Sequence, residues 1–277
     1  MANNDNQQKH GLQRVRFIVL GLKIKFDDFD KEMRIYEQSI DQCILPDLYL
    51  VARLDGRSFT KLTKEVCQFE RPFDVRFHRL MLATVQNLMS VGFNIIYGYT
   101  ESDEISLLFH PQEQTFNRKV RKINSILAGE ASAYFSLELG KVAAFDCRVV
   151  PLPNIKRVLD YFSWRQEDAH RNALNAHCYW LQRKKGLSQE AATQFFVGKS
   201  VAFKNEFLFQ NAINFNELPL WQKRGSGVYF RQVSQTGFNP LTKKETIAQR
   251  NKIWLDEELP LGEDYRQMIE QFIQAAC

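Results

Sequence analysis

The chain has 277 residues, of which 44% are hydrophobic and 25% charged, as is typical of folded proteins with a sizeable core. These fractions exclude collagen-like and wholly disordered chains. The longest apolar run near the N-terminus, Phe17 to Leu22, is far shorter than the roughly 20 residues that span a bilayer. We therefore expect no membrane segment and a cytoplasmic location.

The five cysteines are widely spaced and form no CxxC pair, so they indicate neither a disulfide framework nor a cysteine-rich zinc site. The formal net charge of +5 permits a polyanionic partner without requiring one. Basic residues recur in short clusters, which are equally typical of solvated helix faces. These clusters lie at residues 118–122, 183–185, 223–224 and 243–244.

The chain divides into three parts by composition. Residues 1–25 are mostly polar and show no clear period, so we expect a mobile N-terminal extension. Residues 26–230 are expected to form the main folded domain, with a helical subregion after about residue 151. Residues 231–277 are expected to form a C-terminal appendage of undefined role.

Secondary-structure signals begin with a run of strand formers at 48–54, which ends at a turn signal, Asp55-Gly56-Arg57. Residues 74–91 repeat apolar side chains at about the 3.6-residue helical period, with Asp74 as N-cap and Gly92 just beyond the end. Two short runs, 94–99 and 105–109, are predicted to form a hairpin with an acidic tip.

A helix over 116–139 and a strand over 142–150 complete the order βαββαβ. This order predicts an α+β fold with a ferredoxin-like sheet and helices on one face. Beyond it we expect a mainly helical C-terminal extension, with helices over 160–184 and 188–196, the second capped by Ser188.

A sheet of this order places its first strand beside the central hairpin. Asp55 would then lie next to Asp103 and Glu104, although they are far apart in sequence. Converging carboxylates bind Mg²⁺, and two such ions can assist an in-line phosphoryl displacement. Gly56 would let the backbone approach a metal or a triphosphate closely. The alternative is an ordinary Asp-Gly turn and a solvated hairpin tip.

Five motifs together resemble the tRNA-His guanylyltransferase family, in order and in spacing, over about residues 26 to 230. The family's catalytic domain is similar to the palm of ordinary polymerases, which agrees with the predicted strand order. The motifs are Arg53-Leu54-Asp55-Gly56-Arg57-Ser58-Phe59, Ser102-Asp103-Glu104, Phe145-Asp146-Cys147-Arg148-Val149-Val150, Asp160-Tyr161-Phe162-Ser163-Trp164-Arg165-Gln166 and Lys204-Asn205-Glu206.

The resemblance implies roles for individual residues. Asp55, the Gly56 carbonyl and Asp103 would hold two Mg²⁺ ions, with Glu104 as a further acidic group and Ser102 and Arg53 flanking the site. Residues implied to contact nucleotides are Gly56, Arg57, Ser58, Phe59, Lys64, Arg71, Lys122, Lys204 and Asn214. Residues implied to contact tRNA are His170, Asn172, Arg148 and Arg165.

The stretch from His170 to Ala176 departs from the family's eukaryotic pattern, His-Ile-Asn-Asn-Leu-Tyr-Asn, and keeps only the His, one Asn and the Leu. This departure resembles the bacterial and archaeal branch, which is associated with templated repair of 5′-truncated tRNAs. A lone helical histidine is more often structural, and His177 with Cys178 lacks a fourth ligand for zinc.

The resemblance implies Mg²⁺-dependent nucleotide addition to the 5′ end of tRNA, with ATP or GTP for activation and nucleoside triphosphates as substrates. It also implies a homotetramer. Three alternatives stay open. They are untemplated guanosine addition to tRNA-His, a nucleotide cyclase-like palm enzyme, whose Gly-Gly-Asp/Glu-Glu-Phe signature is absent, and a non-catalytic tRNA-binding protein.

Overall fold

The computed structural model describes residues 17–19, 22–239 and 244–276 of the chain. Its contacts divide the chain into two units, one up to Gln42 and the other from Cys43 onward. In the first unit, β1 (Phe17–Val19) pairs with β2 (Leu22–Ile24), and helix α1 (Phe26–Gln38) follows. Apart from residues 17–19 and 22–25, the expected mobile extension lies outside the described residues.

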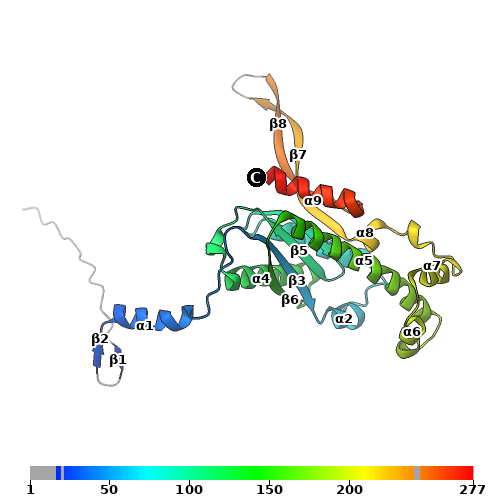
Figure 1. Ribbon diagram of the computed structural model, residues 1–277, viewed down its shortest axis with the longest axis horizontal. Coiled ribbons are helices and arrows are strands. Elements are labelled where there is room, and N and C mark those ends of the chain that lie inside the picture. Colours follow the sequence, from blue (N-terminus) through cyan, green and yellow to red (C-terminus); the bar gives the residue numbers. More distant parts are fainter. Residues whose placement is uncertain (1–16, 20–21, 240–243, 277) are drawn as a thin grey trace, which may run out of the picture. The chain divides into compact units, whose positions relative to one another are not determined.

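The second unit is built on a six-stranded antiparallel sheet with strand order β6-β3-β5-β4-β7-β8 (Figure 1). The first four strands in this order form the predicted ferredoxin-like arrangement, so the palm-like α+β fold is confirmed. Its elements are β3 (Tyr49–Arg57), α2 (Phe59–Lys61), the π-helical turn η1 (Leu62–Val66), α3 (Val75–Leu88), β4 (Ile95–Glu101), β5 (Glu104–Phe109), the 3₁₀ turn η2 (Thr115–Arg118), α4 (Val120–Leu139) and β6 (Ala144–Leu152).

Strand β3 is longer than predicted. Asp55, Gly56 and Arg57 do not form a turn, because they pair with β6 in register with Asp146, Phe145 and Ala144. The chain leaves the strand at Ser58, which has a left-handed φ of 60°. The predicted caps are confirmed: the Asp74 carboxylate accepts from the Arg76 amide, and the Ser188 hydroxyl accepts from the Ala191 amide.

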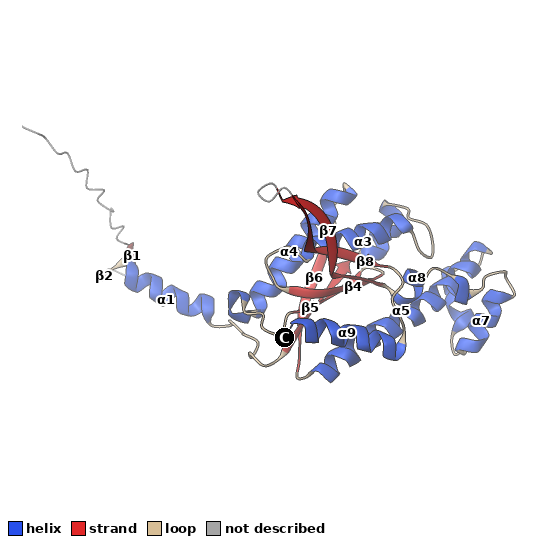
Figure 2. Ribbon diagram, turned by 90° about the horizontal axis from the view of Figure 1, so that it is seen from above, coloured by secondary structure: helices blue, strands red, loops and turns tan. Residues whose placement is uncertain are grey.

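Helices cover both faces of the sheet, whereas the sequence predicted helices on one face only (Figure 2). Helices α3 and α4 cover the predicted face. Side chains alternate along β3, and Leu54 points into the core that includes Val85 of α3 and Phe135 of α4. Val51 points the other way, toward Phe162 of helix α5 (Ile155–Lys184) and Ile269 of helix α9 (Gly262–Ala276).

The chain after residue 151 is mainly helical, as expected, but it also contains two strands that were not predicted. Beyond residue 225 the chain adds two strands to the sheet, and the expected boundary at residue 230 falls inside the first of them. The elements are α6 (Gln189–Phe196), α7 (Val201–Phe209), η3 (Phe215–Glu217), α8 (Leu220–Arg224), β7 (Ser226–Asn239) and β8 (Lys244–Asp256). Among the described residues, no helix has the length and apolar character that a bilayer crossing requires.

Replacing Phe135 by alanine should destabilise the second unit strongly, because its fully buried ring packs against Phe59 and Phe145 at 5.2 and 5.5 Å between centroids. A deletion of this kind typically costs about 3–5 kcal/mol. Urea unfolding would measure it, with Val142→Ala as control because that side chain is 91% exposed. Equal unfolding midpoints for the two variants would contradict the described core.

Candidate active site

The end of β3 meets the tip of the β4–β5 hairpin. Asp55 lies directly opposite Glu104 in the antiparallel register, and the Gly56 amide donates to the Asp103 carbonyl oxygen at 3.0 Å. The expected juxtaposition of Asp55 with Asp103 and Glu104 is therefore present. Ser102 has a left-handed φ of 51° at the hairpin tip, where its hydroxyl donates to the Asp103 carboxylate at 3.1 Å.

The packing around Gly56 requires a glycine, in addition to any need for a ligand to approach the backbone closely. A Cβ at this position would lie 2.5 Å from the ring of Phe59, which folds back beneath the strand. That ring is 2% exposed and packs against Phe135 and Phe145, so it has no room to move. The sequence suggested the glycine's accessibility to ligands but not this constraint.

The hairpin tip concentrates carboxylates in a partly buried place. Burial raises the pKa of Glu101 to about 8, with a further contribution from the charge of Glu104. Burial also raises the pKa of Asp103 and of Glu104, and the nearby charge of Asp55 acts in the same direction on both. Clustered carboxylates of this kind favour the arrival of compensating positive charge.

Two arginines supply part of that charge, and both act on Glu104. Arg53 donates to the Glu104 carboxylate and, at 3.2 Å, to Asp55. The Arg165 Nε lies 3.2 Å from Glu104 Oε1, and its guanidinium also pairs with Asp168. The side chain of Arg165 is only 2% exposed, so the structure directs it to carboxylates inside the protein rather than to the surface.

The remaining oxygens fit a hard divalent cation. Glu104 Oε1 is buried and already faces Arg165 Nε at 3.2 Å, in an ion pair without hydrogen-bond geometry. Within the part of the chain that the structure describes, no group of three or more His, Cys, Asp or Glu side chains is arranged to hold a metal ion. The site therefore offers Asp55, Asp103 and the Gly56 carbonyl, which suits Mg²⁺, because this ion typically takes one or two carboxylates and completes its shell with substrate phosphates.

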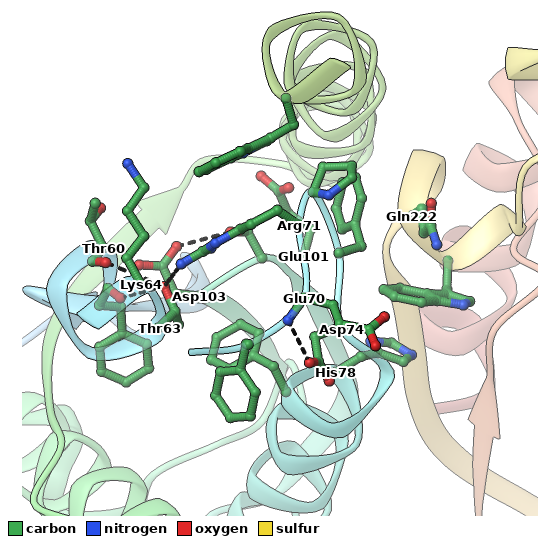
Figure 3. A pocket seen from close by; sticks show the side chains of 18 of the residues that line it. Thr60, Thr63, Lys64, Glu70, Arg71, Asp74, His78, Glu101, Asp103 and Gln222 are labelled. Atoms are coloured by element: carbon green, nitrogen blue, oxygen red, sulfur yellow. Dashed lines mark hydrogen bonds between the residues drawn. The ribbon is translucent and has the colours of Figure 1, made fainter. Parts of the chain in front are cut away.

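A cavity of about 300 Å³ opens beside Asp103 and Glu101 (Figure 3). Lys64 and Arg71 reach into it from the segment after β3, and Tyr179 and Trp180 line it from α5. Aromatic rings, cations and carboxylates thus surround a space next to the candidate metal ligands, as a nucleotide site requires. Its other lining residues include Thr60, Thr63, Phe69, Glu70, Phe73, Asp74, Phe77, His78, Thr100, Trp221 and Gln222.

Three of the residues implied to contact nucleotides, Lys122, Asn214 and Lys204, do not line this cavity. Lys122 is in the first turn of α4, close to Arg118, whose guanidinium binds the Pro46 and Leu48 carbonyls at the start of β3. Asp55 lies about 20 Å further along that strand, at about 3.3 Å per residue. Asn214 caps η3, where it accepts from the Asn216 amide.

Three other implied contacts lie close to the end of β3. Arg57 is exposed as the last residue of this strand, and Ser58 is exposed at the turn that follows. Arg148 lies on edge strand β6, 3.6 Å from Asp146, which is paired with Asp55 across the strands.

His170 and Lys204 line a second cavity of about 600 Å³, between α5, α7 and the start of α9. His170 Nδ1 is buried without a hydrogen-bond partner among the described residues, and Lys204 donates to Asn175 at 2.9 Å. Because successive residues of a helix are rotated by about 100°, Arg165 and His170 lie on different sides of α5. Asn172 is exposed on the same helix and lines neither cavity.

Sequence reasoning missed the roles of Glu101, Asp168 and Trp180. Glu101 lies between the two strands of the predicted hairpin, but nothing in the sequence showed that it would be partly buried. Asp168 lies one turn beyond Arg165 on α5. Ion pairs within a helix commonly have this spacing, so the pairing could have been predicted from the sequence. Trp180 carried no signal, because its importance depends on residues more than a hundred positions earlier.

Replacing Arg165 by leucine should destabilise the protein by about 1–3 kcal/mol, because it removes the buried cation that Glu104 and Asp168 share and leaves each with one other arginine. Arg171 provides the matched control, since it pairs with the same Asp168 but is 72% exposed. Arg171→Leu should cost less than about 1 kcal/mol. Urea denaturation at neutral pH separates the two variants, and similar losses would contradict the assignment of Arg165 to the buried network.

The chain is similar to known proteins over most of its length. The family model described as tRNAHis guanylyltransferase matches residues 30–153, and that of the Thg1 C terminal domain matches residues 156–259. The chain is 32% identical over 222 residues to the tRNA(His) guanylyltransferase of Schizosaccharomyces pombe, covering 76% of this chain and 84% of that protein. It is 35% identical over 196 residues to the enzyme of the same name from Debaryomyces hansenii, covering 66% and 74%.

Solved structures give the same result. A bacterial tRNA(His) guanylyltransferase-like protein in complex with ATP aligns with a TM-score of 0.70 and 26% identity, over 88% of this chain and 98% of that one. The tRNA(His) guanylyltransferase of Saccharomyces cerevisiae aligns with a TM-score of 0.65 and 28% identity, over 77% and 94%. The chain therefore belongs to the tRNA-His guanylyltransferase family and is a nucleotidyltransferase.

Proposed function

We propose that this enzyme adds nucleotides to the 5′ end of tRNA, in the 3′-to-5′ direction, in a Mg²⁺-dependent reaction. The observation that carries the proposal is the meeting of Asp55, Gly56 and Asp103 beside a cavity that holds Lys64 and Arg71. The names of the relatives support tRNA as the substrate. Complexes of bacterial relatives with GTP and with ATP support nucleoside triphosphates.

The chemistry consists of two displacements at phosphorus. A 5′-phosphate oxygen of the tRNA attacks the α-phosphorus of ATP or GTP, and pyrophosphate leaves. The 3′-hydroxyl of the incoming nucleotide then attacks the activated 5′ phosphorus, and the nucleoside monophosphate leaves. Bound Mg²⁺ would stabilise the charge on the phosphoryl oxygens and favour ionisation of the attacking hydroxyl.

The residues of this chain have separable tasks in that reaction. Asp55, Asp103 and the Gly56 carbonyl would hold the metal ions. Arg53 fixes Glu104 next to them, while Lys64 and Arg71 provide positive charge for the triphosphate on the cavity side. Exposed basic residues such as Arg57, Lys184 and Lys185 would hold the tRNA backbone, whereas Arg118 and Lys223 of the basic clusters are buried. Binding should therefore weaken steeply with salt.

For specificity we favour templated repair of 5′-truncated tRNAs. The support is the sequence from His170 to Ala176, which departs from the eukaryotic pattern on a helix that passes the candidate active site. A second candidate is guanosine addition to tRNA-His, which is favoured by the names of the curated relatives at 32–35% identity. Assembly as a homotetramer stays a prediction that light scattering would test.

Incubation with Mg²⁺, nucleoside triphosphates and 5′-monophosphorylated tRNAs should reveal the activity. A tRNA lacking its first nucleotide should be extended by the base complementary to its acceptor strand. Extension of full-length tRNA-His alone, by guanosine, would support the second candidate instead. Gel separation of labelled tRNA measures both, and failure of both RNAs to grow would contradict the proposal.

Replacing Asp55 or Asp103 by asparagine should reduce that incorporation by at least about a hundredfold, because each change removes a charged oxygen ligand. Chelation of divalent ions by EDTA should have the same effect on the unmodified enzyme. Asp27→Asn, an exposed carboxylate on α1 in the other unit, should leave the rate unchanged. Unaltered incorporation by Asp103→Asn would exclude the two-metal site described above.

A further inference from the structure

The ring of Trp180 contacts two cationic side chains in the cavity beside Asp103. The Lys64 ammonium lies 5.3 Å, and the Arg71 guanidinium carbon 5.4 Å, from the centroid of the Trp180 ring. All three residues line the cavity, and Figure 3 shows the Lys64 and Arg71 side chains on the same side of it as Asp103. Trp180 comes from α5, whereas the two cations come from the segment that follows β3.

The two cations are held in place without being neutralised. Arg71 donates to the Thr63 hydroxyl at 3.1 Å, and that hydroxyl donates to the Phe59 carbonyl at 2.7 Å. Among the described residues, no carboxylate lies within ion-pair distance of Lys64 or of Arg71. Burial lowers the pKa of Arg71, and the charge of Asp74 offsets this effect only in part.

We propose that Trp180 is a positioning residue of the nucleotide site, whose ring holds Lys64 and Arg71 for the phosphates of an incoming nucleoside triphosphate. The proposal rests on the proposed function and adds a residue to its substrate site. Long cationic side chains lose conformational freedom when they bind an anion, and a ring that already restricts them reduces this loss. Cation–π attraction to tryptophan supplies the restriction, and partial burial strengthens it.

The other use of a half-buried tryptophan in such a cavity is as a stacking surface for the nucleobase. The positions of the cations favour the phosphate role, since both already lie within 5.4 Å of the ring centroid and a stacked base would compete with them for contact with the ring. The two roles differ in one measurable respect. A stacking surface acts only on ligands that have a base, whereas held cations act equally on a bare polyphosphate.

The test uses the full-length protein and measures the binding of inorganic tripolyphosphate and of ATP, each with Mg²⁺, by isothermal titration calorimetry. Trp180→Leu should weaken both ligands by the same factor, roughly three- to tenfold. Trp180→Phe keeps an aromatic face and should remain within about twofold of the unmodified protein. Trp254→Leu is the matched control, because Trp254 pairs with Arg231 at 5.0 Å on the C-terminal hairpin.

Three outcomes would overturn the proposal. If Trp180→Leu weakens ATP but not tripolyphosphate, the ring is a stacking surface. If neither affinity changes, or the unmodified protein binds no tripolyphosphate, the cations are not a phosphate site held by Trp180.

A double-mutant cycle distinguishes an effect of Trp180 on the two cations from a general folding defect. In a Lys64→Gln, Arg71→Gln background, the further change Trp180→Leu should no longer affect tripolyphosphate binding. A loss of the same size in that background would assign Trp180 a merely structural role. Because no RNA is present, these results are independent of whether the tRNA extension assay succeeds.

Discussion

The antiparallel pairing of β3 with β5 is the constraint on which the active site depends. It sets Asp55 opposite Glu104 and leaves the Gly56 amide to bind the Asp103 carbonyl, so two segments separated by almost fifty residues form one site. A shift of one residue would turn every side chain of the strand to the opposite face. The helices on both faces bury alternate residues of β3 and so prevent such a shift.

The electrostatics of the site follow from this pairing. Carboxylates brought together at a sheet end repel one another, and burial raises the pKa of Glu101, Asp103 and Glu104. Arg53 and Arg165 compensate for Glu104, and Arg53 also pairs with Asp55 at 3.2 Å. Among the described residues Asp103 forms no ion pair, so the site combines an internally balanced carboxylate, Glu104, with one that needs an external partner. A carboxylate with an internal cation belongs to a structural charge network, whereas a carboxylate without one can bind a cation from solution.

Much of the fold was predictable from contiguous residues. They show the local periodicity of each element, the helix caps at Asp74 and Ser188, and the order of strands along the chain. The β7–β8 pair was not predictable, since its outer part is exposed on both faces and therefore lacks the apolar alternation that marks a strand. The contacts of Arg165 and Trp180 were also hidden, because their partners are distant in sequence. Motif resemblance placed Lys122 with the nucleotide, but the structure puts it at the opposite end of β3.

The central claim is that the end of β3 and the hairpin tip bind divalent cations that take part in nucleotidyl transfer. Crystals soaked with Mn²⁺ and a nucleoside triphosphate would test it directly through the anomalous scattering of manganese. The account predicts anomalous peaks beside the carboxylates of Asp55 and Asp103, with the triphosphate extending toward Lys64 and Arg71. Manganese bound elsewhere, with none beside these two carboxylates, would contradict it.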